Sequence, residues 1–144
     1  MLNLKKLLTK VLAWINTVQS VTTYADSDKT ITIPSGAGFK SYTYRTITLP
    51  ANGKYILLMN GGCGSVSGTT RYYAIQATIA SGTPTVANKL RQQTPSVSGG
   101  PNSGVGYFET GNSAVTINID GILYGEPNGK CTGAWHSTQV IRLK

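Results

Sequence analysis

From residue 29 onward, the sequence alternates short runs of β-forming residues with turns rich in Gly, Pro and Asn. In the clearest run, residues 114–120, the apolar Val115, Ile117 and Ile119 alternate with polar residues. This is the period of a strand with one buried face. Strands are expected over 29–33, 39–49, 54–60, 70–79, 104–109, 114–120 and 134–144, with a shorter one over 85–90. Many short strands without intervening helices predict a mainly β fold, an antiparallel β-sandwich or jelly roll.

One of these strands differs from the others, because residues 55–59, with the sequence YILLM, are apolar at every position. A strand with two apolar faces must be covered on both of them. The segment is therefore predicted to be a central strand, covered by the second sheet or by a neighbouring subunit.

The first 21 residues follow the period of a helix instead. Their apolar residues recur at spacings of three and four, which is the seam of a coiled coil, and Lys5, Lys6 and Lys10 fall off that seam. The seam consists of Leu4, Leu7, Val11, Trp14 and Val18. We expect a short amphipathic oligomerisation helix over 1–21, a polar linker over 22–30 and a β-sandwich head over 31–144.

Four roles are open to this helix: a secretion signal, a membrane anchor, a packing helix and an oligomerisation stalk. Thr9 and Lys10 interrupt the apolar run, which argues against a signal peptide, and the run is too short to span a membrane. A lone helix of this length is marginal in water, so something must cover its apolar face. The breadth of the seam favours a parallel trimer, with docking on its own domain or on a membrane surface as alternatives.

The chain carries a net charge of +8, from 13 Lys and Arg against 5 Asp and Glu, and the basic residues are dispersed. Nucleic-acid binders gather such residues on one face or in a recognisable module, so no nucleic-acid partner is expected. A dispersed positive field is attracted to polyanionic surfaces such as a bacterial envelope. The alternative is that the charge serves solubility alone.

Catalysis and metal binding need clustered ionisable groups, which this sequence lacks. Cys63 and Cys131 are expected as free thiols, with a disulfide between them as the alternative. Two cysteines and the single His136 do not make a metal site, so neither a metal nor a cofactor is expected. The five acids are scattered and no nucleophile has an orienting partner, so we do not expect an enzyme.

Aromatic residues offer the best candidates for a binding site. Sugar rings present apolar faces that stack on Tyr and Trp, while their hydroxyls pair with polar groups such as Arg. The candidates are Tyr42, Tyr44, Arg45, Arg71, Tyr72, Trp135 and His136. Packing in the core or at a subunit interface is the alternative for each of them.

Three features resemble known protein families. Residues 47–59, ITLPANGKYILLM, resemble the strand–turn–strand of C1q- and tumour-necrosis-factor-like jelly rolls. Residues 2–12, LNLKKLLTKVL, are similar to the N-terminal helix of small prophage-encoded structural proteins of Gram-positive bacteria. A helix followed by a β-head also resembles, in plan, the small trimeric heads at the tips of phage tail fibres.

The resemblance implies a virion protein: a homotrimeric tail-fibre tip or receptor-binding protein that adheres to a bacterial surface glycan or anionic polymer. The helix would then join the copies to one another and to other virion proteins. Two alternatives stay open. One is a non-binding structural or decoration component of a phage tail, baseplate or capsid, and the other is a bacterial surface adhesin.

Overall fold

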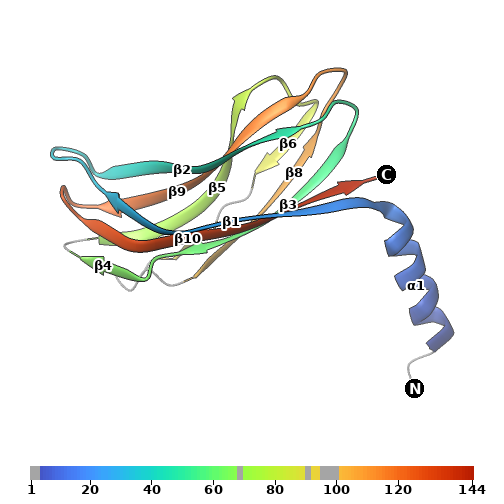
Figure 1. Cartoon of the computed structure of the whole chain (residues 1–144), viewed down its shortest axis with the longest axis horizontal. Coiled ribbons are helices and arrows are strands. Elements are labelled where there is room, and N and C mark those ends of the chain that lie inside the picture. The colour runs from blue at the N-terminus through green and yellow to red at the C-terminus, as the bar shows by residue number, and fades with distance from the viewer. Residues whose placement is uncertain (1–3, 68–69, 90–91, 95–100) are drawn as a thin grey trace.

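The computed structural model describes residues 4–67, 70–89, 92–94 and 101–144. Within these ranges the chain forms two antiparallel β-sheets packed face to face, with one helix projecting from one end (Figure 1). The predicted fold class, a mainly β antiparallel sandwich with a short N-terminal helix, is confirmed.

The larger sheet, sheet A, has the strand order β1-β10-β3-β8-β6, with β4 paired to β10, and the smaller sheet, sheet B, has the order β2-β9-β5-β7. The strands of sheet A are β1 (Val18–Thr32), β3 (Lys54–Gly62), β4 (Ser65–Ser67), β6 (Val86–Lys89), β8 (Asn102–Glu109) and β10 (Lys130–Leu143). Those of sheet B are β2 (Phe39–Leu49), β5 (Thr70–Ser81), β7 (Gln92–Thr94) and β9 (Val115–Gly125). The helix α1 (Leu4–Thr17) precedes β1.

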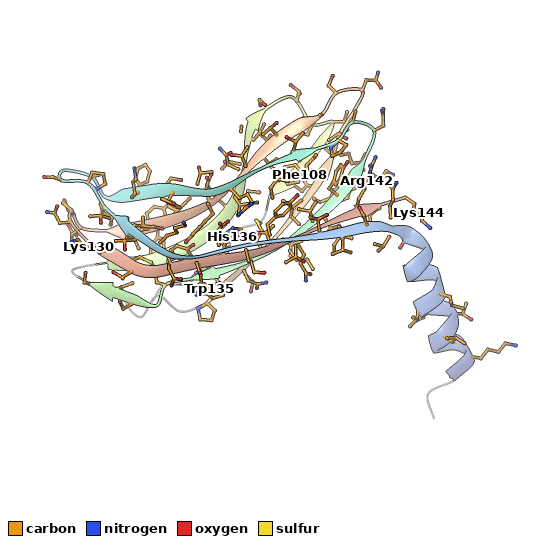
Figure 2. The ribbon with its side chains drawn as sticks, in the orientation of Figure 1. Phe108, Lys130, Trp135, His136, Arg142 and Lys144 are labelled. Carbon is orange, nitrogen blue, oxygen red and sulfur yellow. A yellow bond between two sulfur atoms is a disulfide. The ribbon has the colours of Figure 1, made fainter. Side chains whose placement is uncertain are left out.

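The core lies between the sheets and is built by the predicted alternation. Val115, Ile117 and Ile119 of β9 are fully buried, and they pack against residues of β3 such as Tyr55 and Leu57. This cluster fills the proximal half of the sandwich, near α1. A second cluster fills the distal half, at the end opposite the helix where Lys130 lies (Figure 2). Its buried members are Ile31, Ile33, Cys63, Tyr73, Leu123, Cys131 and Ala134.

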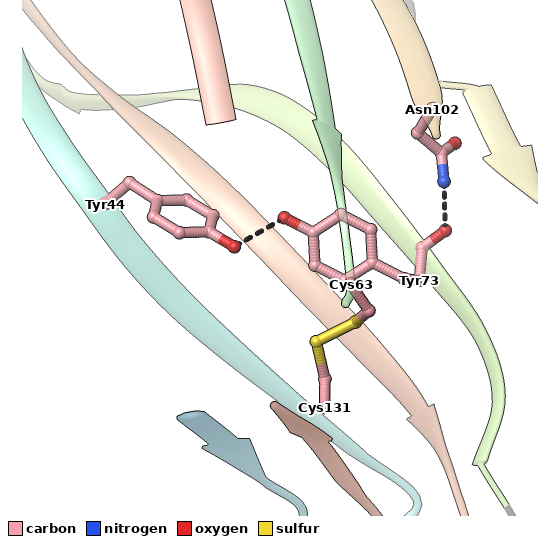
Figure 3. Close-up of a disulfide and its surroundings, with 5 residues drawn as sticks. All are labelled: Tyr44, Cys63, Tyr73, Asn102 and Cys131. Atoms are coloured by element: carbon pink, nitrogen blue, oxygen red, sulfur yellow. Dashed lines mark hydrogen bonds between the residues drawn. A yellow bond between two sulfur atoms is a disulfide. The ribbon is translucent and has the colours of Figure 1, made fainter. Parts of the chain in front are cut away.

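Two tyrosines close the distal core from the side of sheet B. The hydroxyls of Tyr44 and Tyr73 are hydrogen-bonded at 2.7 Å, and Asn102 Nδ2 donates to the Tyr73 carbonyl at 2.7 Å (Figure 3). Burial raises the pKa of Tyr44 to about 12 and that of Tyr73 further. Both rings lie directly on β9 because residue 121 is Gly: a Cβ there would come within 2.6 Å of each. A side chain at this position would therefore push the two sheets apart.

Cys63 and Cys131 form a disulfide bond beside this tyrosine pair (Figure 3). The expectation of free thiols is therefore wrong. The two residues are 68 positions apart, but β3 and then β4 pair with the same edge of β10, so Cys63, between β3 and β4, lies beside Cys131 with their Cα atoms 5.7 Å apart. That separation is typical of disulfides.

The N-terminal segment differs from the prediction. α1 ends at Thr17, and residues 18–32 form one edge strand that pairs with β10 from Leu143 to Lys130. The expected helix to residue 21 and the expected linker over 22–30 are therefore wrong. The polar residues that indicated a linker lie on an edge strand, which is largely exposed. At Asp28, the φ angle of 60° coincides with a shift in register, so the strand contains a β-bulge there.

α1 projects from the proximal end and packs on neither sheet (Figure 1). Leu8, Val11 and Leu12 are 56%, 43% and 51% exposed, so the apolar residues among the described helix side chains are uncovered. Of the predicted seam, Val18 belongs to β1 instead, and the side chains of Leu4, Leu7 and Trp14 lie outside those that the structure describes. No helix within the described ranges is both long and apolar enough to cross a membrane.

Candidate functional site

The residues predicted to bind a ligand do not form one site. Tyr42 and Tyr44 pack against the distal core, and His136 is only 1% exposed. Tyr72 lies on the outer face of sheet B and Trp135 on the outer face of sheet A. Arg45, whose side chain is 40% exposed, pairs with Asp26 as described next, and the side chain of Arg71 is not among those that the structure describes.

Asp26 of β1 connects the two sheets. Its carboxylate accepts hydrogen bonds from Arg45 of β2, from Nε at 3.0 Å and from Nη2 at 2.9 Å. His136 Nε2 of β10 lies 2.9 Å from the same carboxylate, and its Nδ1 lies 3.1 Å from the Thr138 hydroxyl. The Arg45 guanidinium also lies 5.7 Å from the centre of the Tyr24 ring. These contacts give Arg45 and His136 structural partners rather than a ligand-facing position.

The charges of this cluster are set by its contacts. Hydrogen bonds from Arg45 lower the pKa of Asp26 to about 2, so the carboxylate is ionised at neutral pH. Burial lowers the pKa of His136 by more than the neighbouring Asp26 raises it, so the imidazole is neutral. Because a carboxylate only accepts, Nε2–H donates to Asp26, and Nδ1 accepts from the Thr138 hydroxyl.

We expect the free energy of unfolding to fall as the pH is lowered. In the unfolded chain, His136 takes up a proton near its ordinary pKa of 6.5, whereas the folded state resists protonation. The unfolded state therefore binds more protons, and stability is lost from about pH 6.5 downward. Asp26 adds a second loss as the pH falls through its ordinary value of 3.8 towards about 2.

Urea unfolding at pH 7, 5 and 3 measures this dependence. The variant His136→Gln removes the imidazole and its titration, so its own stability should change less between pH 7 and pH 5 than that of the wild type. Equal stability of the wild-type protein at all three values would contradict the assignment.

Trp135 lies on the outer side of sheet A in the distal half of the sandwich (Figure 2). Its indole rests on Gly62, its register partner in β3, where an added Cβ would lie 3.1 Å from the indole nitrogen. Beside the ring is a shallow hollow of about 610 Å³, lined by Ala25, Asp26, Ser27, Trp135, His136 and Ser137. A half-exposed indole next to serine hydroxyls can stack on a sugar ring and bind its hydroxyls.

An apolar patch occupies the proximal half of the same outer face. It consists of Val21, Ile56, Leu58, Val105 and Ile141, which are neighbours across β1, β10, β3 and β8. Val21 and Val105 are 52% and 45% exposed. The apolar run 55–59 is thus covered by sheet B on its inner face, as predicted, while its outer face carries no further layer of the described chain. Cover by a neighbouring subunit stays a prediction.

Phe39 and Tyr124 were not predicted from the sequence to take part in a site. Both lie in a row with Tyr72, because β9 places Tyr124 between Phe39 of β2 and Tyr72 of β5. The sequence shows an aromatic residue in each of the three strands. It does not show which residues are opposite one another, since that depends on the strand register.

The comparisons with known proteins give likenesses in structure alone. No protein-family model matches the chain, and no curated protein matches its sequence. Solved structures that match include the baseplate tripod of bacteriophage Tuc2009, at 12% identity and a TM-score of 0.38 over 84% of this chain and 62% of that one.

The structure of infectious bursal disease virus, Gx strain, matches at 10% identity and a TM-score of 0.35, over 88% of this chain and 41% of that one. The P-domain of Macrobrachium rosenbergii nodavirus matches at 10% identity and a TM-score of 0.27, over 85% of this chain and 94% of that one. The chain spans less than two thirds of the length of the first two of these proteins.

Proposed function

We propose that the protein is a homotrimeric structural protein of a phage virion, a tail-fibre tip or receptor-binding protein that adheres to a bacterial surface glycan or anionic polymer. The observation that carries the proposal is the separation of two kinds of exposed surface. The uncovered apolar side chains of α1 lie at the proximal end, and the half-exposed Trp135 lies in the distal half (Figures 1 and 2). A protein anchored by one end and binding with the other requires this arrangement. No catalytic activity is part of the proposal.

The proximal end supports self-association. A three-helix bundle would bury Leu8, Val11 and Leu12, each of which contributes up to about 2 kcal/mol when it is fully removed from water. The apolar patch on sheet A lies in the same half of the molecule and offers additional area for contact between subunits, or with another virion protein. That patch is also what favours the second candidate, a structural component of a tail, baseplate or capsid without a ligand.

The distal half supports adhesion. The indole of Trp135 lies beside the hollow, where it can stack on a sugar ring, and the net charge of +8 attracts anionic polymers. Three equivalent sites that meet a repetitive polymer raise the avidity without any single site being tight. Weak stacking at each site is therefore sufficient for adhesion.

Adsorption to bacterial envelopes rich in anionic polymers tests the proposal. We expect the full-length protein to adsorb at low salt and to be released as the ionic strength rises above 0.15 M, where screening acts within about 8 Å. Trp135→Ala should reduce adsorption about tenfold or more. Each of the three sites of a trimer then loses its stacking contact, and the three losses combine in the avidity. Lys10→Gln, which removes one dispersed charge, should have a much smaller effect.

Two outcomes would contradict the proposal in different ways. If a variant lacking the charges of Lys5, Lys6 and Lys10 no longer adsorbs while Trp135→Ala adsorbs normally, charge alone causes the binding. If the wild-type protein adsorbs to no envelope even at low salt, receptor binding is excluded and the ligand-free structural role replaces it.

A further inference from the structure

Three aromatic side chains form a row across the outer face of sheet B. The row consists of Phe39, Tyr124 and Tyr72, which are register partners in β2, β9 and β5. The rings of Tyr72 and Tyr124 stack at 4.5 Å between centroids, and Phe39 lies 6.0 Å from Tyr124 at a tilt of 33°. Phe39 begins an edge strand and is 57% exposed. An exposed phenyl ring at the end of a row of stacked rings is unusual for a residue that only supports the fold.

The row continues along the strands into a polar ladder on the same face. Asp120 accepts hydrogen bonds from Thr43 at 2.7 Å and from Thr78 at 2.6 Å, and Asn118 accepts one from Thr46 at 2.8 Å. Strands rise about 3.3 Å per residue, so Asn118 lies about 20 Å along β9 from Tyr124. The surface therefore offers aromatic rings at one end and ordered polar groups at the other, beyond Ile122, and its whole length spans several sugar units.

The hydrogen bonds of this ladder orient its hydroxyls. Thr43 and Thr78 each give their proton to the carboxylate of Asp120, so their oxygens keep lone pairs that can accept from a ligand. Asp120 itself is 5% exposed and is covered by these partners. A ligand rich in hydroxyl donors with an apolar ring face matches both parts of the surface, and a sugar polymer has this combination.

Charge selects among sugar polymers. The chain carries +8, and exposed Lys40 follows Phe39 directly in β2. Lys130 lies at the same distal end (Figure 2). Asp26 is paired with Arg45, whereas Asp120 of the ladder accepts hydrogen bonds from two threonines and is only 5% exposed. The net charge of +8 therefore attracts a polyanion to the molecule more strongly than a neutral polymer.

We propose that the row of Phe39, Tyr124 and Tyr72, together with the polar ladder beside it, binds the pyranose rings of an anionic polysaccharide. A ring of the polymer stacks on Phe39 at the open edge of the row, and its neighbours lie along β9 towards Asn118. This inference rests on the proposed adhesion to a surface polymer and identifies a binding surface on the sheet opposite Trp135.

Surface plasmon resonance with three immobilised polymers tests the inference on the full-length protein. Polygalacturonate has sugar rings and negative charge, dextran has sugar rings without charge, and inorganic polyphosphate has charge without rings. We expect Phe39→Ala and Tyr72→Ala to weaken binding to polygalacturonate about tenfold and to weaken the lower-affinity binding to dextran similarly. Binding to polyphosphate should be unchanged, because charge alone is involved there.

Ile79→Ala is the control, because it removes an exposed apolar side chain of β5 that lies outside the aromatic row. It should bind all three polymers as the wild type does. Phe39 is exposed at the start of its strand, so Phe39→Ala should keep the far-ultraviolet circular dichroism and thermal midpoint of the wild type.

Several outcomes overturn the inference. The first is that Phe39→Ala binds polygalacturonate with wild-type affinity. The second is that Phe39→Ala loses as much affinity for polyphosphate as for polygalacturonate. A fall in native mass for Phe39→Ala would show that the row is a protein interface. If envelopes adsorb Phe39→Ala and the wild type equally, this inference fails while the proposed function stands. If polygalacturonate binding depends on Phe39 but no envelope adsorbs the protein, the proposed function fails and the inference stands.

Discussion

Replacing both Cys63 and Cys131 by alanine is expected to lower the free energy of unfolding by about 4 kcal/mol. The disulfide closes a loop of 68 residues, and loop-closure entropy for that length amounts to about 4 kcal/mol removed from the unfolded state. In a chain of 144 residues, this corresponds to a fall of roughly 10 °C in the thermal midpoint. Both cysteines lie in the distal core, so the loss should begin there.

Urea unfolding of the double variant, with and without reductant, measures the effect. Reduced wild-type protein should unfold at nearly the same urea concentration as the double variant, because both lack the same covalent link. Adding reductant to the double variant should change nothing. If the free energies of unfolding of the oxidised wild type and the double variant differ by less than about 1 kcal/mol, the disulfide is absent in solution. Two titratable thiols in the denatured wild-type protein would show the same.

The sandwich could be predicted because several of its longer strands show, in their own sequence, which face is buried. In β9, the alternation of Val115, Ile117 and Ile119 with polar residues places one face in the core without knowledge of any other strand. The predicted strand 39–49 has the bounds of β2. Strands β4 and β7, of three residues each, were missed because so short a run shows no period.

The N-terminal boundary was misplaced because an edge strand does not need this alternation. Residues 18–26 of β1 are mostly exposed on both faces, and what holds them is the main-chain pairing with β10. That pairing depends on the backbone of two distant segments, which no local pattern reveals. The polar residues around Asp28 belong to a bulge within the strand and not to a linker.

The candidate site shows the same limit. Trp135 and Tyr72 were identified as aromatic residues next to polar ones, and both lie on outer faces. Tyr44 and His136 have the same local pattern, yet their side chains point into the sandwich. Alternate residues of a strand face opposite sides of the sheet, and these two lie on the inner side. The disulfide and the aromatic row both depend on the register between strands, which is a property of the whole fold. Local sequence therefore identifies the type of residue, and the topology decides which of them meet.

Deleting residues 1–17 is expected to reduce the native mass about threefold while the sandwich stays folded. The structure sets the boundary at Thr17, because Val18 already pairs with Leu143 and a longer deletion would remove part of sheet A. Full-length protein should therefore scatter light as three copies of a 15.3 kDa chain, and the truncated protein as one. The near-ultraviolet circular dichroism of the truncated chain should persist, because Trp135 and the core tyrosines remain in place.

A second variant, with Leu8, Val11 and Leu12 all replaced by serine, removes the exposed apolar side chains of α1 at constant length. It should be monomeric like the truncated chain, because a helix without an apolar face gains nothing from association. A trimer that survives both changes would place the interface on the apolar patch of Ile56 and Leu58 instead. A full-length protein of single-chain mass would exclude the trimer. Loss of near-ultraviolet circular dichroism on truncation would show that α1 belongs to the fold of its own head, since only then would removing a projecting helix disturb the packing around Tyr73.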